Sequence, residues 1–77
     1  MVKIYSTPTC SYCHMAKEFF DEHKIKYQEF NVAEDAKARE EMINKSGQMG
    51  VPVIDVDGEI VVGFDKAKLA KLLKIKE

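Results

Sequence analysis

The strongest constraint on the fold is the order in which strand-like and helix-like segments follow one another along the chain. Short stretches rich in β-branched and aromatic residues alternate with longer stretches in which apolar residues recur every three or four positions. The pattern predicts strands over 2–6, 25–32, 52–56 and 59–62. It predicts a first helix over 10–24, a second that ends at 46, and a last helix that begins after 65. The predicted order of elements is therefore β-α-β-α-β-β-α.

The connections between these elements predict how the strands pair. A strand, a helix and a second strand in succession favour parallel strands joined by a right-handed crossover. Asp57-Gly58 favours a two-residue hairpin, because both residues tolerate positive φ, and a hairpin makes the last two strands antiparallel. We therefore expect an α/β fold with one mixed four-stranded sheet and three helices. The 77 residues provide one domain, 1–77.

Residues that favour helix ends occur at the expected boundaries. Thr9 is predicted to cap the first helix, and Asn31 with Glu34 has the spacing of a capping box for the second. Gly47 suits the left-handed position that ends a helix, and Asp65 is predicted to cap the last helix.

The charge balance excludes several kinds of partner. Twelve basic and 13 acidic residues give a net charge of −1, which provides no electrostatic footprint for nucleic acid or for an anionic membrane. No segment approaches the ~18 consecutive apolar residues of a membrane span. The first residues also lack the pattern of a signal peptide, so we expect a cytoplasmic protein.

Two cysteines, Cys10 and Cys13, carry the chemistry that the sequence indicates. Cys10 falls where a strand ends and a helix begins, and the free N–H groups and positive dipole end of a helix favour a thiolate there. Cys13 lies one helical turn later on the same face and is flanked by core positions. We therefore predict that Cys10 attacks a substrate disulfide and that the less exposed Cys13 resolves the mixed disulfide. Lys3, His14 and Lys17 are predicted to be solvated.

Three other interpretations of this cysteine pair stay open at this level. A zinc site needs four ligands, and His14 and His23 are the only histidines that could add to the cysteines. Cys10 to His14 also matches the Cys-x-x-Cys-His pattern of haem attachment, although an alternating α/β pattern surrounds it. The third interpretation is a pair of inert cysteines in a core helix. We expect no bound metal or cofactor.

The chain resembles glutaredoxins and the closely related NrdH-redoxins, which have the thioredoxin fold. The resemblance rests on a strand before Thr-Cys-Ser-Tyr-Cys, a Val-Pro pair before a later strand, and Gly-Phe-Asp before the last helix. It implies that Pro52 is cis and faces the cysteines. It also implies a substrate groove formed by Tyr12, Val51, Pro52, Gly63, Phe64 and Asp65.

The resemblance implies a thiol–disulfide oxidoreductase, an enzyme that carries electrons to protein disulfides, with ribonucleotide reductase among the candidate substrates. Glutaredoxins usually have a lysine where this chain has Thr7, and a glycine where it has Val62. Both differences argue against tight glutathione binding. The Gly63-Phe64 pair is more similar to NrdH-redoxins, whose reductant is thioredoxin reductase, so the expected electron donor is thioredoxin reductase with NADPH, or else glutathione. The alternatives are a glutathione-dependent deglutathionylating glutaredoxin and an iron–sulfur or metal carrier. A monomer is expected.

Overall fold

The computed structural model describes residues 2–75 and contains the predicted elements in the predicted order. The strands are β1 (Val2–Ser6), β2 (Tyr27–Asn31), β3 (Val53–Val56) and β4 (Glu59–Val62). The helices are α1 (Ser11–Glu22), α2 (Ala36–Ser46) and α3 (Lys66–Leu73). None of the helices within 2–75 has the length and apolar character needed to span a membrane.

The four strands form one mixed sheet in the order β2-β1-β3-β4, which confirms the predicted pairing. β1 is parallel to β2, as the βαβ connection predicts, whereas β1 with β3 and β3 with β4 are antiparallel. Asp57 and Gly58 make the hairpin between β3 and β4 with φ values of 49° and 97°. The predicted hairpin is therefore confirmed.

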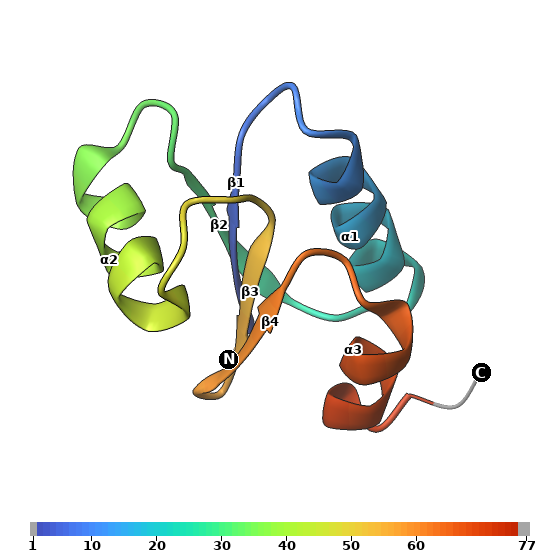
Figure 1. Ribbon diagram of the computed structural model, residues 1–77. Coiled ribbons are helices and arrows are strands. Elements are labelled where there is room, and N and C mark those ends of the chain that lie inside the picture. The colour runs from blue at the N-terminus through green and yellow to red at the C-terminus, as the bar shows by residue number, and fades with distance from the viewer. Residues whose placement is uncertain (1, 76–77) are drawn as a thin grey trace.

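The helices cover both faces of this sheet, with α1 and α3 on one face and α2 on the other (Figure 1). Successive residues of a strand point to opposite faces, so Ile4 belongs to the core beneath α1 and α3, and Tyr5 to the core beneath α2. Phe20 of α1 is fully buried, and its ring centroid lies 5.3 Å from that of Tyr27 on β2. The two cores hold the helices on a rigid sheet.

Two predicted helix caps are wrong by a few residues. Cys10, rather than Thr9, is the N-cap of α1, and its side chain accepts from the Cys13 backbone N–H. The N-cap of α2 is Asp35, whose Oδ1 accepts from the Ala38 N–H at 3.0 Å. In both places the cap is the residue directly before the first helical turn. The sequence spacing had placed both caps earlier in the chain.

Asn31 has a different role from the one that its sequence spacing predicts. Its Oδ1 accepts from the N–H of Ala33 at 3.0 Å, and this bond stabilises the turn between β2 and α2. Asparagine forms such local turns as readily as it caps helices. The predicted ends at Gly47, with φ 72°, and at Asp65, the N-cap of α3, are confirmed.

A polar cluster joins α2 to the sheet on the face opposite α1. The Lys45 Nζ donates to Asp55 Oδ2 at 2.8 Å and to the Tyr5 hydroxyl at 3.0 Å, and Tyr5 in turn donates to Glu41. Burial alone would lower the pKa of Lys45, but its bonds to Asp55, Tyr5 and Glu41 raise it. The cluster therefore satisfies the Asp55 carboxylate, which is buried in the sheet.

Candidate active site

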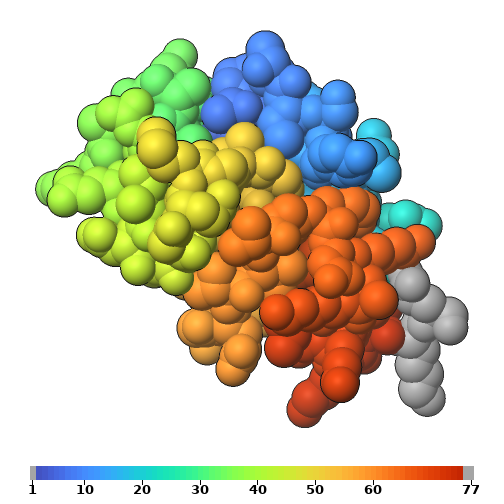
Figure 2. Space-filling view, in the orientation of Figure 1, coloured from blue at the N-terminus to red at the C-terminus, as the bar shows by residue number. Residues whose placement is uncertain are grey.

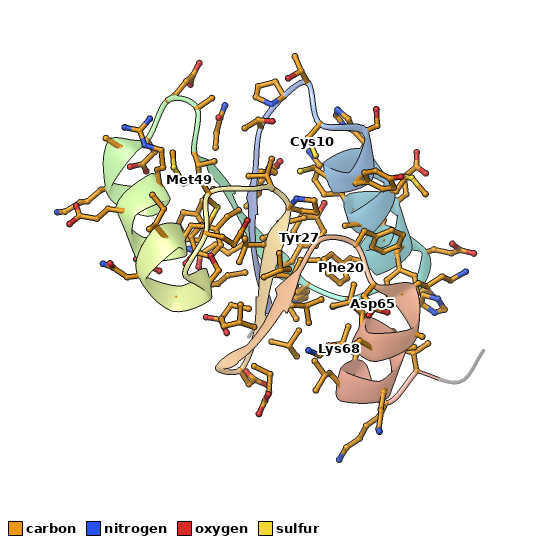
Figure 3. All side chains as sticks on the ribbon, in the orientation of Figure 1. Cys10, Phe20, Tyr27, Met49, Asp65 and Lys68 are labelled. Carbon is orange, nitrogen blue, oxygen red and sulfur yellow. The ribbon has the colours of Figure 1, made fainter. Side chains whose placement is uncertain are left out.

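Cys10 lies at the N-terminal end of α1, directly after the loop that follows β1 (Figure 3). Its backbone is extended, with φ −86° and ψ 111°, and its Sγ accepts from the Cys13 N–H at 3.2 Å. The residue is half-buried, so part of it is open to a partner. A negative charge on this sulfur would be stabilised by the amide and by the positive end of the helix dipole.

Cys13 lies one turn into α1 and is fully buried, and both cysteines are free thiols. Burial raises the pKa of the Cys13 thiol to about 12, and the hydrogen bond with the Cys10 side chain adds to this shift. A backbone hydrogen bond from Thr7 and the charge of Lys17 act in the opposite direction. The prediction that Cys13 is the less exposed cysteine is therefore confirmed.

A groove of about 370 Å³ contains all six residues predicted to bind substrate. These residues come from three separate segments, around positions 12, 52 and 64, which lie side by side on the face shown in Figure 2. Its lining is Tyr12, Val51, Pro52, Val62, Gly63, Phe64 and Asp65. Val62, which was predicted only as a departure from glutaredoxins, exposes 53% of its surface here.

Two backbone features shape the wall of this groove. The Val51-Pro52 peptide bond is cis, which confirms the expectation drawn from the resemblance. Gly63 has φ 82°, a conformation that side chains rarely adopt, and its N–H donates to the Pro52 carbonyl at 2.8 Å. The two groove segments are thus hydrogen-bonded to each other.

Phe64 and Asp65 connect the groove to α3. The Phe64 ring packs against the core of α1 and α3, with its centroid 5.9 Å from that of Phe19. The Asp65 Oδ1 accepts from the Lys68 N–H at 3.1 Å, and so caps the helix. Figure 3 shows Asp65 at the start of α3. The structure therefore assigns Asp65 the capping contact and also places it on the groove.

Lys17 was predicted to be solvated, and the structure corrects this prediction. The Lys17 side chain exposes only 21% of its surface, and its Nζ contacts Glu29 Oε2 at 2.6 Å. Glu29 also accepts from the Ser6 hydroxyl at 3.1 Å. The four-residue spacing from Cys13 to Lys17 indicates that the two side chains share one face of the helix. That Glu29 is the partner of Lys17 follows only from the strand register, which places Glu29 beside Ile4.

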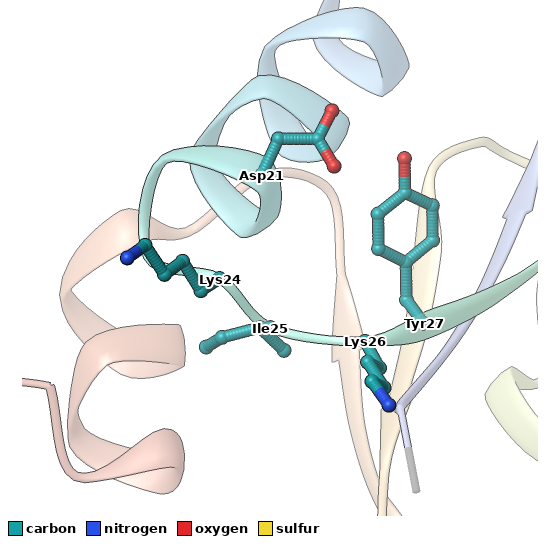
Figure 4. Close-up of a pocket in the computed structure, with 5 residues that line it drawn as sticks. All are labelled: Asp21, Lys24, Ile25, Lys26 and Tyr27. Atoms are coloured by element: carbon teal, nitrogen blue, oxygen red, sulfur yellow. The ribbon is translucent and has the colours of Figure 1, made fainter.

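A second hollow, of about 550 Å³, lies at the other end of α1. Figure 4 shows the Asp21 carboxylate and the Tyr27 hydroxyl beside this space, which Lys24, Ile25 and Lys26 also line. It is larger than the groove, and neither Cys10 nor Cys13 is among the lining residues of either space. Size therefore does not identify the reactive site. The groove is the better candidate, because Tyr12, which lies between the two cysteines in the sequence, lines it.

No group of three or more His, Cys, Asp or Glu side chains within residues 2–75 is arranged to hold a metal ion. His14 instead places its Nε2 3.0 Å from the Pro8 carbonyl oxygen. A partly exposed cysteine at a helix N-terminus, a buried cysteine one turn later and a cis-proline that shares a groove with Tyr12 together define a dithiol protein of the thioredoxin fold.

Comparison with known proteins identifies the family within this class. Residues 2–61 match the glutaredoxin family model, and the chain belongs to the glutaredoxin family. It is 53% identical over 74 residues to an uncharacterized glutaredoxin-like 8.6 kDa protein in the rubredoxin operon of Clostridium pasteurianum. The alignment covers 96% of this chain and 99% of that one.

Relatives of both expected kinds are present. Glutaredoxin 3 of Escherichia coli is 41% identical over 64 residues, with 83% of this chain and 77% of the relative covered. The glutaredoxin-like protein NrdH of Lactococcus lactis is 38% identical over 72 residues, with 94% and 99% covered. The crystal structure of the thioredoxin-like protein BC3987 superposes with a TM-score of 0.89 at 35% identity, covering 94% of this chain and 99% of that one. The expected glutaredoxin-like identity and thioredoxin fold are confirmed.

Proposed function

We propose that this chain is a dithiol electron carrier that reduces disulfides in proteins, with Cys10 as the nucleophile and Cys13 as the resolving thiol. The observation that carries the proposal is the unequal placement of the two sulfurs. Cys10 is partly exposed at the N-terminal end of α1, two residues before Tyr12 of the groove, whereas Cys13 is fully buried one helical turn later. An incoming disulfide can therefore reach only the first sulfur directly.

The reaction has two exchange steps. The Cys10 thiolate attacks one sulfur of the substrate disulfide, forms a mixed disulfide and releases the first substrate thiolate. Cys13 then loses its proton and attacks the Cys10 sulfur, which releases the second substrate thiolate. The protein leaves with a Cys10–Cys13 disulfide, and two electrons have passed to the substrate, whose thiolates take up protons from water.

The groove supports an extended protein segment as the substrate. Its lining is apolar apart from the Tyr12 hydroxyl and Asp65, and Tyr12 exposes 62% of its surface at the edge. Backbone groups of Val51 lie on the same wall, next to the cis bond. A disulfide-containing protein can thus place apolar side chains beside its reacting sulfur, with Asp65 at one end of the groove.

Thioredoxin reductase with NADPH is the electron donor that the groove favours. Glutathione carries two carboxylates, and none of the described residues that line the groove is cationic. Thr7 stands where glutaredoxins usually have a lysine. At the position where they usually have a glycine, the exposed Val62 side chain takes up space in the groove. Glutathione is the second candidate, because Asp65 lines the groove at the start of α3, where its carboxylate suits the amino group of glutathione and the first helix amides suit a carboxylate.

The two donors are distinguished by a pair of coupled assays. Reduction of insulin disulfides is followed with NADPH and thioredoxin reductase, and separately with NADPH, glutathione and glutathione reductase. We expect NADPH oxidation to be at least about tenfold faster with thioredoxin reductase than with glutathione and glutathione reductase. A factor of this size corresponds to the loss of one ion pair between the groove and a glutathione carboxylate. Val62→Gly serves as a matched variant and is expected to raise the glutathione-linked rate. Activity only in the glutathione system would contradict the donor assignment.

A further inference from the structure

Lys17 lies on the side of α1 that faces the sheet, where a charged residue is uncommon. Residues three and four positions apart share one face of a helix, so Cys13, Lys17 and Phe20 belong to one row. Cys13 and Phe20 are both fully buried. Lys17 therefore runs beside the buried thiol, and only 21% of its side chain reaches solvent.

The sheet beneath holds the Lys17 ammonium in place. Tyr27 packs against Phe20 on the α1 face, and Glu29, two residues further along β2, points to the same face. Its Oε2 accepts from Lys17 Nζ at 2.6 Å and from the Ser6 hydroxyl at 3.1 Å. Ser6 is buried at the end of β1, so the carboxylate is fixed by two partners on different elements.

The resolving thiol needs what this ammonium can supply. Burial raises the pKa of Cys13 to about 12, so very little of it is a thiolate at neutral pH, although the thiolate is the species that attacks. A nearby positive charge stabilises the developing negative sulfur, and it does so most effectively where little water screens it. Lys17 is the cation that acts on Cys13 in this direction.

We propose that Lys17, held by Glu29 and Ser6, is a positioning residue for the resolving step of the proposed function and stabilises the Cys13 thiolate as it attacks Cys10. In this step the Cys13 proton leaves to water, the Cys13–Cys10 disulfide forms, and the bond from Cys10 to the substrate sulfur breaks. The substrate leaves as a thiolate. The inference rests on the proposed function but concerns its second step alone.

The other charged groups near Cys13 do not replace Lys17. Glu29 on β2 pairs directly with the Lys17 ammonium, and His14 on α1 is among the charges that act on Glu29, whereas Lys17 is the cation that acts on the Cys13 thiol. The hydrogen bond to Glu29 raises the pKa of Lys17, and the bond to Lys17 lowers that of Glu29. Because both shifts favour the charged forms, Lys17 and Glu29 are both charged at neutral pH.

The two steps can be measured separately with a small aromatic disulfide that releases a coloured thiolate. Attack by Cys10 releases the first thiolate at a rate proportional to reagent concentration, and attack by Cys13 releases the second at a rate independent of it. Both rates are recorded by stopped flow across pH 6–9. The variants are Lys17→Gln and Lys17→Met, which remove the charge, Lys17→Arg, which keeps it, and Lys37→Gln as a control on the exposed surface of α2.

We expect both neutral variants to slow the second release about tenfold at neutral pH, the effect of one pKa unit, while the first release is unchanged. Their second-step pH profiles shift to higher pH, Lys17→Arg restores most of the rate, and Lys37→Gln matches the parent. An unchanged second release, or equal slowing in Arg, Gln and Met, would overturn the proposal. Failure of the proposed function itself is a distinct result, because the parent protein would then show no second release at all.

Discussion

Replacing Cys10 by serine is expected to lower disulfide reduction by at least about a thousandfold, to the rate without protein, because the nucleophile of the first step is lost. A serine oxygen is mostly protonated at neutral pH and cannot form the disulfide that the second step requires. Cys13 cannot substitute, since it is fully buried and burial raises its pKa to about 12. The measurement is the initial rate of insulin disulfide reduction with excess donor.

The substitution is clean because serine fits the local structure. Cys10 is the N-cap of α1, and its side chain accepts from the Cys13 N–H. Serine is among the preferred N-cap residues, so the variant should melt at or above the temperature of the parent protein. A Cys10→Ser protein that folds and still reduces insulin at a tenth of the normal rate or faster would contradict the assignment of the nucleophile.

The second large effect concerns the core that supports α1. Phe20→Ala should lower the free energy of unfolding by about 3–5 kcal/mol, because it leaves a cavity at a fully buried position. Phe20 packs against Phe19 and Tyr27, so the loss affects contacts between α1 and β2. In a domain of 77 residues this corresponds to a fall in melting temperature of the order of 20 °C.

Tyr12→Ala provides the matched control for this stability prediction. It also removes an aromatic ring from α1, but that ring exposes 62% of its surface and lies on the groove. Its effect on the free energy of unfolding should stay below about 1 kcal/mol. Thermal and urea unfolding of both variants measure the difference, and equal losses would show that the buried ring does not carry the stability assigned to it.

The sequence was sufficient to predict the order and pairing of the elements. β-branched strands, the βαβ order and the Asp57-Gly58 turn are local signals, and they determine which strands pair and in which direction. Cys10 and Cys13 are close in sequence, so their unequal exposure also followed from the helical spacing. These are features in which local preference and the final fold agree.

Features that depend on contacts between distant elements were not predictable in this way. Glu29 meets Lys17 because β2 pairs with β1 in one register, which brings Glu29 opposite Ile4 on the α1 face. The polar cluster of Lys45 and Asp55 likewise needs α2 to pack on β3. The N-cap of α1 was also predicted one residue too early, because Thr9 and Cys10 compete for the same amides and only the loop geometry decides between them.

The cis bond before Pro52 and the groove formed by Tyr12, Gly63 and Phe64 came from the family resemblance alone. Spacing gives no means to bring positions 12, 52 and 63 together, since β2 and α2 separate the first two in the chain, and β3 and β4 separate the last two. The structure brings these residues together where β3 begins and β4 ends, and Tyr12 of α1 lines the same groove.

The unequal roles of the two cysteines are tested most directly by trapping the intermediate. Cys13→Ser protein is mixed with an oxidised protein substrate, and the products are analysed by non-reducing electrophoresis and by mass spectrometry of the intact complex. The account predicts a stable one-to-one complex joined through Cys10, which a reductant releases, and no complex with Cys10→Ser. A complex joined through Cys13 in the Cys10→Ser protein, or full turnover without any complex in the Cys13→Ser protein, would contradict it.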